Sequence, residues 1–179
     1  MNNKDQNITL LLSACQKGNQ KAQLEIYSRY HKAMYNVALR ILNNSFDAED
    51  VMQEGFLSAF TKLENFKGEV TFGAWLKRII INASLQLIRK RKENTVTLDE
   101  NMNHSIDDEP ASLDFSQVQV VQVLEAITKL KDNYRIAISL HLIEGYDYEE
   151  MTAIMETSYD NCRTLVSRAK AKIRKQLVN

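Results

Sequence analysis

The sequence runs DAEDVMQE at residues 47–54 and FGAWLKRI at residues 72–79, so an acidic segment precedes a basic one. Apolar residues recur three and four positions apart in and around both segments, which is the spacing of amphipathic helices. Residues 72–92 contain six Lys or Arg and no acid, whereas residues 93–117 contain seven acids and no Lys or Arg. Charge is therefore sorted by segment in a chain whose formal net charge is zero.

The composition favours a helical protein. With 179 residues, 44% of them apolar, the chain can bury a core in one domain or in two small ones. Five Gly and one Pro are too few for the many turns of an all-β design. We predict an all-α fold of two small helical domains, at residues 1–92 and 118–179, joined by a flexible acidic linker at residues 93–117. The linker loses helical periodicity and holds Pro110, so we expect it to be solvated and mobile.

Three helices form the predicted first domain. The first follows a break near Gly18, the second has Ser45 as its N-cap, and the third has Thr71 as its cap. The expected core positions are Leu24, Tyr27, His31, Met34, Ala38 and Ile41 on the first helix, Ala48, Met52, Gly55, Phe56, Ala59 and Leu63 on the second, and Trp75, Leu76, Ile79, Ile80, Ala83 and Leu87 on the third.

The second domain ends in a helix-turn-helix pattern. Gly145 has the place of a residue with positive φ after a helix, and Asp147 and Glu150 have capping-box spacing before a short helix. The turn at residues 156–158 leads to a last helix that runs to about Leu177. The expected core positions are Val118, Val121, Leu124, Ile127, Leu130, Tyr134, Ile138, Leu142, Met151, Ile154, Met155, Cys162, Val166, Ala169, Ile173 and Leu177.

The last helix is a candidate for DNA binding. Its apolar residues share one face, so the polar and basic side chains between them project from the other sides of the helix. From residue 161 onward there are six Lys or Arg and no acid. Early residues of such a helix contact base edges and later Lys and Arg contact phosphates. A solvated C-terminal helix whose basic residues favour its dipole is the alternative, and the preceding short helix and turn favour DNA. The candidate residues are Arg163, Thr164, Ser167, Arg168 and Lys170.

A second basic cluster lies on the third helix of the first domain. It could contact phosphates, or it could simply be the favourable last turn of a helix. Phe66, beside Lys67, could stack a displaced base, although a lone aromatic more often packs within its bundle. The cluster contains Lys77, Arg78, Arg89, Lys90 and Arg91.

Asp47, Asp50 and Glu54 line one side of the second helix. Catalytic carboxylate pairs need a cleft that separates their pKa values, so a protein-docking surface or plain solvation fits this exposed side better. The three His are scattered, and Cys15 and Cys162 match no metal or redox spacing. We predict no catalytic residue, no metal and no cofactor.

No apolar run is long enough to span a bilayer, and the run at residues 8–12 is too short for a signal sequence. These observations predict a cytoplasmic protein without membrane insertion. Its net neutrality argues against tight DNA binding without a partner.

Two groups of residues resemble the second and fourth conserved regions of extracytoplasmic-function (ECF) sigma factors of the sigma-70 family. The first group comprises DAED at 47–50, Gln53, Glu54, Phe56, Phe72, Trp75, Leu76, Arg78, Ile79 and Asn82. The second comprises Leu130, Tyr134, Arg135, Leu140, Glu144, Gly145, YEEM at 148–151 and SRAK at 167–170. Together they cover most of the chain in the order found in that family.

The resemblance implies a bacterial initiation subunit that binds core RNA polymerase, directs it to promoter DNA and assists melting. Asp50, Gln53 and Glu54 would face the clamp helices of the largest subunit. Phe66 and Asn82 would hold a flipped base of the −10 element, with the basic cluster near its backbone. The residues expected at the −35 element are Asn161, Arg163, Thr164, Ser167 and Arg168. Expected partners also include the polymerase flap region and an anti-sigma factor, which often holds members of this family inactive.

The chain departs from the family pattern at several positions. Thr152 replaces an alanine of the first helix of the motif, and Glu156 replaces the glycine that commonly starts its turn. Other departures are Gln86, Lys131, Asn161, Cys162 and Leu165. The rival hypothesis is a helix-turn-helix regulator whose N-terminal bundle senses a ligand or dimerises; an enzyme fits least.

Overall fold

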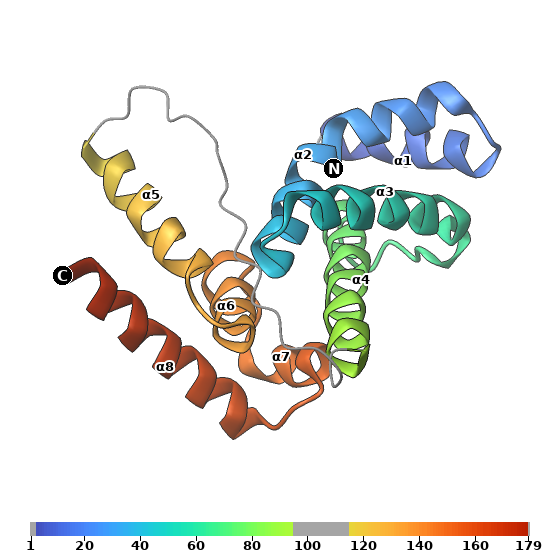
Figure 1. Cartoon of the computed structure of the whole chain (residues 1–179). Coiled ribbons are helices and arrows are strands. Elements are labelled where there is room, and N and C mark those ends of the chain that lie inside the picture. Colours follow the sequence, from blue (N-terminus) through green and yellow to red (C-terminus); the bar gives the residue numbers. More distant parts are fainter. Residues whose placement is uncertain (1–2, 95–114, 179) are drawn as a thin grey trace. The chain divides into compact units, whose positions relative to one another are not determined.

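The computed structural model describes residues 3–94 and 115–178, and every regular element within these ranges is a helix (Figure 1). The prediction of an all-α fold is confirmed. The chain divides into two compact units. The first holds α1, α3, η1, α4 and most of α2, and the second holds α5 to α8. The predicted mobile linker falls mainly on residues 95–114, which lie outside the described residues.

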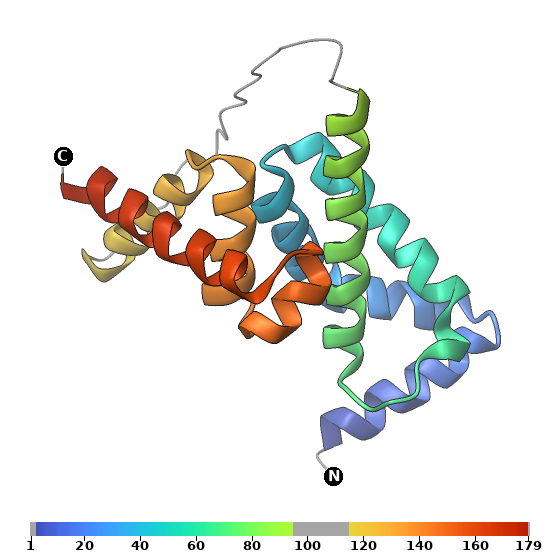
Figure 2. The ribbon, with the colours of Figure 1, turned by 90° about the horizontal axis from the view of Figure 1, so that it is seen from below.

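In the first unit, α3 packs against α4, and the short 3₁₀ turn η1 contacts both α1 and α3. Both views show α3 beside α4 (Figures 1 and 2). The elements of this unit are α1 (Asn3–Gln16), α2 (Gln20–Leu42), α3 (Ser45–Thr61), η1 (Leu63–Asn65) and α4 (Phe72–Asn94).

The six core positions predicted for the second helix are all buried, five of them on α3 and the sixth, Leu63, on η1. On α2 the predicted stripe is wrong at its start: Leu24 is 68% exposed, whereas Ile26 is fully buried. Apolar residues at three- and four-residue steps allow two stripes there, and tertiary packing selects the other one. On α4, Ile79, Ala83 and Leu87 are only half-buried, and Ile81, Ser84 and Leu85 take their place in the core. That helix is apolar on most sides, so periodicity alone does not identify its buried face.

The helix starts show one correction and one confirmation. Asn44, not Ser45, is the N-cap of α3, and its side chain accepts a hydrogen bond from the backbone N of Asp47 at 3.1 Å. Thr71 caps α4 as predicted, because its Oγ1 accepts a hydrogen bond from the backbone N of Ala74 at 3.3 Å. Both caps satisfy N–H groups that the first helical turn leaves unpaired.

In the second unit, α8 packs against α5, α6 and α7. Gly145 has φ +81°, and Asp147 and Glu150 form both hydrogen bonds of the predicted capping box. The helix-turn-helix prediction is confirmed: α7 ends at Met155 and α8 begins at Tyr159. The elements are α5 (Phe115–Thr128), α6 (Asp132–Ile138), the π-helical turn η3 (Ser139–Ile143), α7 (Tyr148–Met155) and α8 (Tyr159–Val178).

The core of this unit is shorter than its apolar spacing predicts. Cys162, Val166, Ala169 and Ile173 of α8 are buried, but Leu177 is 44% exposed. Leu124 and Leu142 are also exposed, at 43% and 54%. Helical spacing identifies a face, but it does not give the length over which a neighbouring helix covers that face.

We predict that Gly55→Ala destabilises the first unit. A Cβ at Gly55 would lie 2.2 Å from Cδ1 of Ile80, which is fully buried on α4. Overpacking of this kind costs about 1–3 kcal/mol, and the higher helix propensity of Ala offsets about 1 kcal/mol of that cost. Urea unfolding followed by the fluorescence of Trp75, the single Trp, measures this unit. The companion variant Ile80→Val removes Cδ1, so Gly55→Ala should cost less in that background. An equal cost in both backgrounds would contradict this packing.

We predict that Glu156→Gly stabilises the turn between α7 and α8. Glu156 is in the left-handed region, with φ 54° and ψ 50°, which costs a non-glycine residue about 1 kcal/mol. Glu156→Ala is the control, because it removes the side chain without relieving the backbone. Amide hydrogen exchange in α7 and α8 should be slower in the Gly variant than in the Ala variant. Equal exchange in the two variants would show that the backbone is unstrained.

Candidate functional site

One side of α3 is an exposed acidic surface. Asp50, Gln53 and Glu54 are all exposed and share this side, since they lie three and four residues apart. Gln53 Nε2 donates a hydrogen bond to Glu49 Oε1 at 2.8 Å. The sequence of α3 contains no Lys or Arg, so every charged side chain on this surface is negative. Such a surface attracts a basic protein partner and repels DNA phosphates.

The basic residues predicted on α4 separate onto different sides of the helix. Arg78, Asn82 and Arg89 are four and seven residues apart and share one side, which we call the α4 stripe. Lys77 and Arg91 lie on the other side, and Lys90 lies between the two. Asn82 and Lys90 are exposed, and Lys77, Arg78 and Arg89 are half-buried.

Arg91 has a partner that the sequence did not predict. Its guanidinium donates two hydrogen bonds to the carboxylate of Asp47 on α3, at 2.5 and 2.6 Å. These hydrogen bonds raise the pKa of Arg91 above its usual value. The pair joins the first turn of α3 to the last turns of α4. A separation of 44 residues gives no local signal for such a contact.

Phe66 packs within the bundle and still exposes part of its ring. Its centroid lies 5.7 Å from that of Phe72 and 5.4 Å from that of Trp75. Trp75 was predicted to be in the core, but it is half-buried. It lies three residues before Arg78 and seven before Asn82, which places the Phe66–Trp75 pair on the same side of α4 as the α4 stripe.

An open groove of about 660 Å³ lies along α8. It brings together five of the six predicted residues: Arg163, Thr164, Ser167, Arg168 and Lys170. Four of them are exposed and Lys170 is half-buried. The sixth, Asn161, is exposed in the first turn of α8, where its Nδ2 donates a hydrogen bond to Thr157 Oγ1 at 2.8 Å. The groove presents hydroxyls, guanidinium groups and an ammonium, which suit base edges and phosphates.

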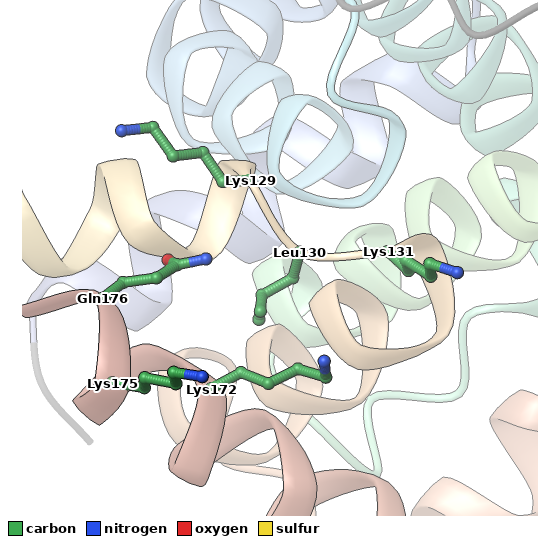
Figure 3. A pocket seen from close by; sticks show the side chains of 6 residues that line it. All are labelled: Lys129, Leu130, Lys131, Lys172, Lys175 and Gln176. Atoms are coloured by element: carbon green, nitrogen blue, oxygen red, sulfur yellow. The ribbon is translucent and has the colours of Figure 1, made fainter.

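A separate pocket of about 360 Å³ lies on another side of α8 (Figure 3). Lys129, Leu130 and Lys131 line it from the connection between α5 and α6, and Lys172 and Lys175 line it from α8, while the ammonium groups of Lys129 and Lys131 point away from Leu130 in different directions. Lys172 Nζ also lies 5.4 Å from the ring centroid of Tyr134. The four ammonium groups therefore do not converge on one point. Sequence analysis did not find this pocket, because its two lysine pairs are about forty residues apart.

Both cysteines are buried free thiols. Burial raises the pKa of both the Cys15 and the Cys162 thiols, which keeps them protonated and unreactive. Across residues 3–94 and 115–178, no group of His, Cys, Asp and Glu is arranged to hold a metal ion. Among the helices that the structure describes, none is long and apolar enough to cross a membrane.

Comparison with known proteins gives the same family for both halves of the chain. Residues 26–94 match Sigma-70 region 2, and residues 121–173 match Sigma-70 region 4. The ECF RNA polymerase sigma-E factor of Escherichia coli K12 is 29% identical over 174 residues, covering 92% of this chain and 91% of that protein. SigW, an ECF RNA polymerase sigma factor of Bacillus subtilis, is 28% identical over 173 residues, covering 90% of this chain and 91% of SigW.

Solved structures agree with this result. The sigma factor RpoE of Bartonella quintana, in complex with the anti-sigma factor NepR, has a TM-score of 0.64 and 26% identity, covering 86% of this chain and 94% of that one. CnrH, in complex with the cytosolic domain of CnrY, has a TM-score of 0.56 and 25% identity, covering 94% and 95%.

The rival hypothesis of a regulator with a sensing bundle is not favoured, because the N-terminal bundle itself matches region 2. The two matched regions lie in family order and account for about two-thirds of the chain. The chain therefore belongs to the ECF sigma factors of the sigma-70 family, which bind RNA polymerase and direct promoter-specific initiation.

Proposed function

We propose that this sigma factor uses three separate surfaces: the acidic side of α3 for core RNA polymerase, the α4 stripe for the −10 element, and the α8 groove for the −35 element. One observation carries the proposal. The α3 surface is acidic and lacks Lys and Arg, whereas the α8 groove includes Arg163, Arg168 and Lys170 with one acid, Asp160. The first surface suits a basic protein, and the second suits DNA.

At the −35 element, α8 would lie in the major groove, which admits one helix. Arg163 and Arg168 can each donate two parallel hydrogen bonds to a guanine edge, and Thr164 and Ser167 can contact either base type. Lys170, one turn farther along, would contact phosphate. Lys has no planar fork, so it contributes affinity rather than sequence preference.

At the −10 element, the Phe66–Trp75 pair would provide an aromatic surface on which an extruded base stacks. The amide of Asn82 can donate and accept hydrogen bonds along the edge of that base. Extruding a base costs a few kcal/mol, and its capture offsets part of this cost. Arg78 and Arg89 would contact the backbone. Arg91 has five N–H donors, so it can keep Asp47 and still reach a phosphate.

We further propose that the protein is cytoplasmic and has no catalytic activity of its own. A sigma factor contributes binding and positioning to initiation, and the polymerase performs the chemistry. Two similar proteins have been solved with partner proteins: CnrH with the cytosolic domain of CnrY, and the sigma factor RpoE with the anti-sigma factor NepR. A protein that covers the acidic side of α3 would keep this chain from polymerase. An anti-sigma factor is therefore a proposed partner.

We predict that Arg163→Ala or Arg168→Ala weakens use of the −35 element by about 1–3 kcal/mol and leaves polymerase binding intact. Promoter competition in reconstituted transcription measures the preference, and titration with core polymerase measures the binding. Lys170→Ala is the contrast, because loss of a phosphate contact should lower affinity for all promoter sequences together. Equal loss of core binding in the two Arg variants would contradict this assignment.

We predict that Asp50→Lys, alone or with Glu54→Lys, reduces association with core polymerase, because it opposes a basic partner with positive charge. Glu25→Lys is a matched control, since Glu25 is an exposed acid on α2. The defect of the Asp50 variant should shrink as salt rises, because salt screens exposed charges. Unchanged association of the Asp50 variant in a titration at low salt would refute the docking role of α3.

A further inference from the structure

Two large apolar side chains share the acidic side of α3. Phe46 is 81% exposed and Leu57 is 68% exposed. Phe46 lies four residues before Asp50, and Leu57 lies four residues after Gln53, so all four side chains belong to one helical stripe. Phe46 and Leu57 are eleven residues apart, or about 16 Å along the axis.

This arrangement differs from the isolated exposed apolar residues that are normal on protein surfaces. The two side chains stand at opposite ends of one stripe, with the acids between them. Protein interfaces combine large apolar anchors, which leave water on binding, with charged groups that set orientation. DNA would not cover this stripe, because Asp50 and Glu54 repel phosphates.

We propose that Phe46 and Leu57 are apolar anchors of the contact with core RNA polymerase. They would enter two apolar depressions on either side of a basic surface that faces Asp50 and Glu54. This inference rests on the proposed docking role of α3 and extends it to two residues that carry no charge.

The anchors are held in place before binding. Phe46 lies in the first turn of α3. The Asn44 cap holds the start of this turn, and the Asp47–Arg91 ion pair ties the turn to α4. Leu57 lies between the buried residues Phe56 and Ala59. A side chain on a rigid backbone loses less conformational freedom when it binds, so more of its burial contributes to affinity.

A second copy of the chain fits this stripe less well. A symmetric dimer through α3 would place the same stripe on both sides of the contact, and therefore Asp50 and Glu54 against their own copies. Like charges that face each other across an interface oppose association. A basic surface of the polymerase meets the same stripe without this penalty.

The test is a titration of full-length variants with core RNA polymerase at low and moderate salt. Phe46→Ala and Leu57→Ala should each weaken binding about tenfold, because each removes one buried apolar contact. The loss should be the same at both salt concentrations, whereas the Asp50→Lys loss should shrink. Leu10→Ala on α1, where Leu10 is 73% exposed, is the matched control and should bind normally. Circular dichroism checks that each variant is folded.

The outcomes separate this inference from the proposed function. If the two Ala variants bind as the parent chain does while Asp50→Lys is impaired, the inference is overturned and the docking role of α3 stands. If Asp50→Lys also binds normally, the docking role itself fails. If sedimentation shows that the Ala variants lose self-association and polymerase binding is unchanged, the stripe is a dimer contact and the inference is overturned.

Discussion

The close contact of α3 with α4 organises the first unit. Ile80 Cδ1 occupies the space that a side chain at position 55 would need, so glycine allows this close approach without a change in the Ile80 rotamer. The buried positions of α3 lie on the side opposite Asp50 and Glu54, and Ile80 lies on the side of α4 opposite Asn82. One packed interface therefore directs the acidic surface and the α4 stripe away from each other, as the proposed simultaneous binding of polymerase and DNA requires.

In the second unit, the packing of α8 likewise leaves separate surfaces facing the solvent. Its buried stripe, Cys162 to Ile173, packs into the unit and leaves two other sides of the helix in solvent. One side carries the groove with Arg163 and Arg168, and another carries Lys172 and Lys175. The capping box on α7 and the left-handed Glu156 fix the turn that orients α8. Conformational strain at Glu156 thus accompanies a defined position of α8, the helix proposed to contact DNA.

Most helices, some of their caps and the buried face of α3 could be predicted from the sequence, because the patterns that identify them lie within a few helical turns. The core of α3 and the capping box on α7 each depend on residues within a few turns of one another. Leu24 was misplaced because α2 offers two apolar stripes, and only the packing of neighbouring helices distinguishes them. Ser45 and Asn44 are both good caps, and the hydrogen bond to Asp47 decides between them.

Contacts between distant segments gave no sequence signal. Arg91 looked like one member of a basic cluster, and its pairing with Asp47 depends on how α3 and α4 cross. The lysine pocket likewise requires the fold to bring α8 beside the connection between α5 and α6. For Phe66 the sequence allowed two interpretations, packing within the bundle or stacking of a base. Its ring contacts with Phe72 and Trp75 and its partial exposure agree with both.

Zero net charge gives the chain no whole-molecule attraction to DNA, and two further features oppose tight binding: repulsion by the α3 acids and a small proposed contact area. Two packed helices separate the acidic surface from the α4 stripe by about 20 Å. The screening length at physiological salt is about 8 Å, so repulsion across that distance is weak. Contact area is the stronger limit, because each unit offers only a few side chains to DNA. In the proposed function, polymerase holds both units near one promoter, which makes the second contact intramolecular and raises its effective concentration.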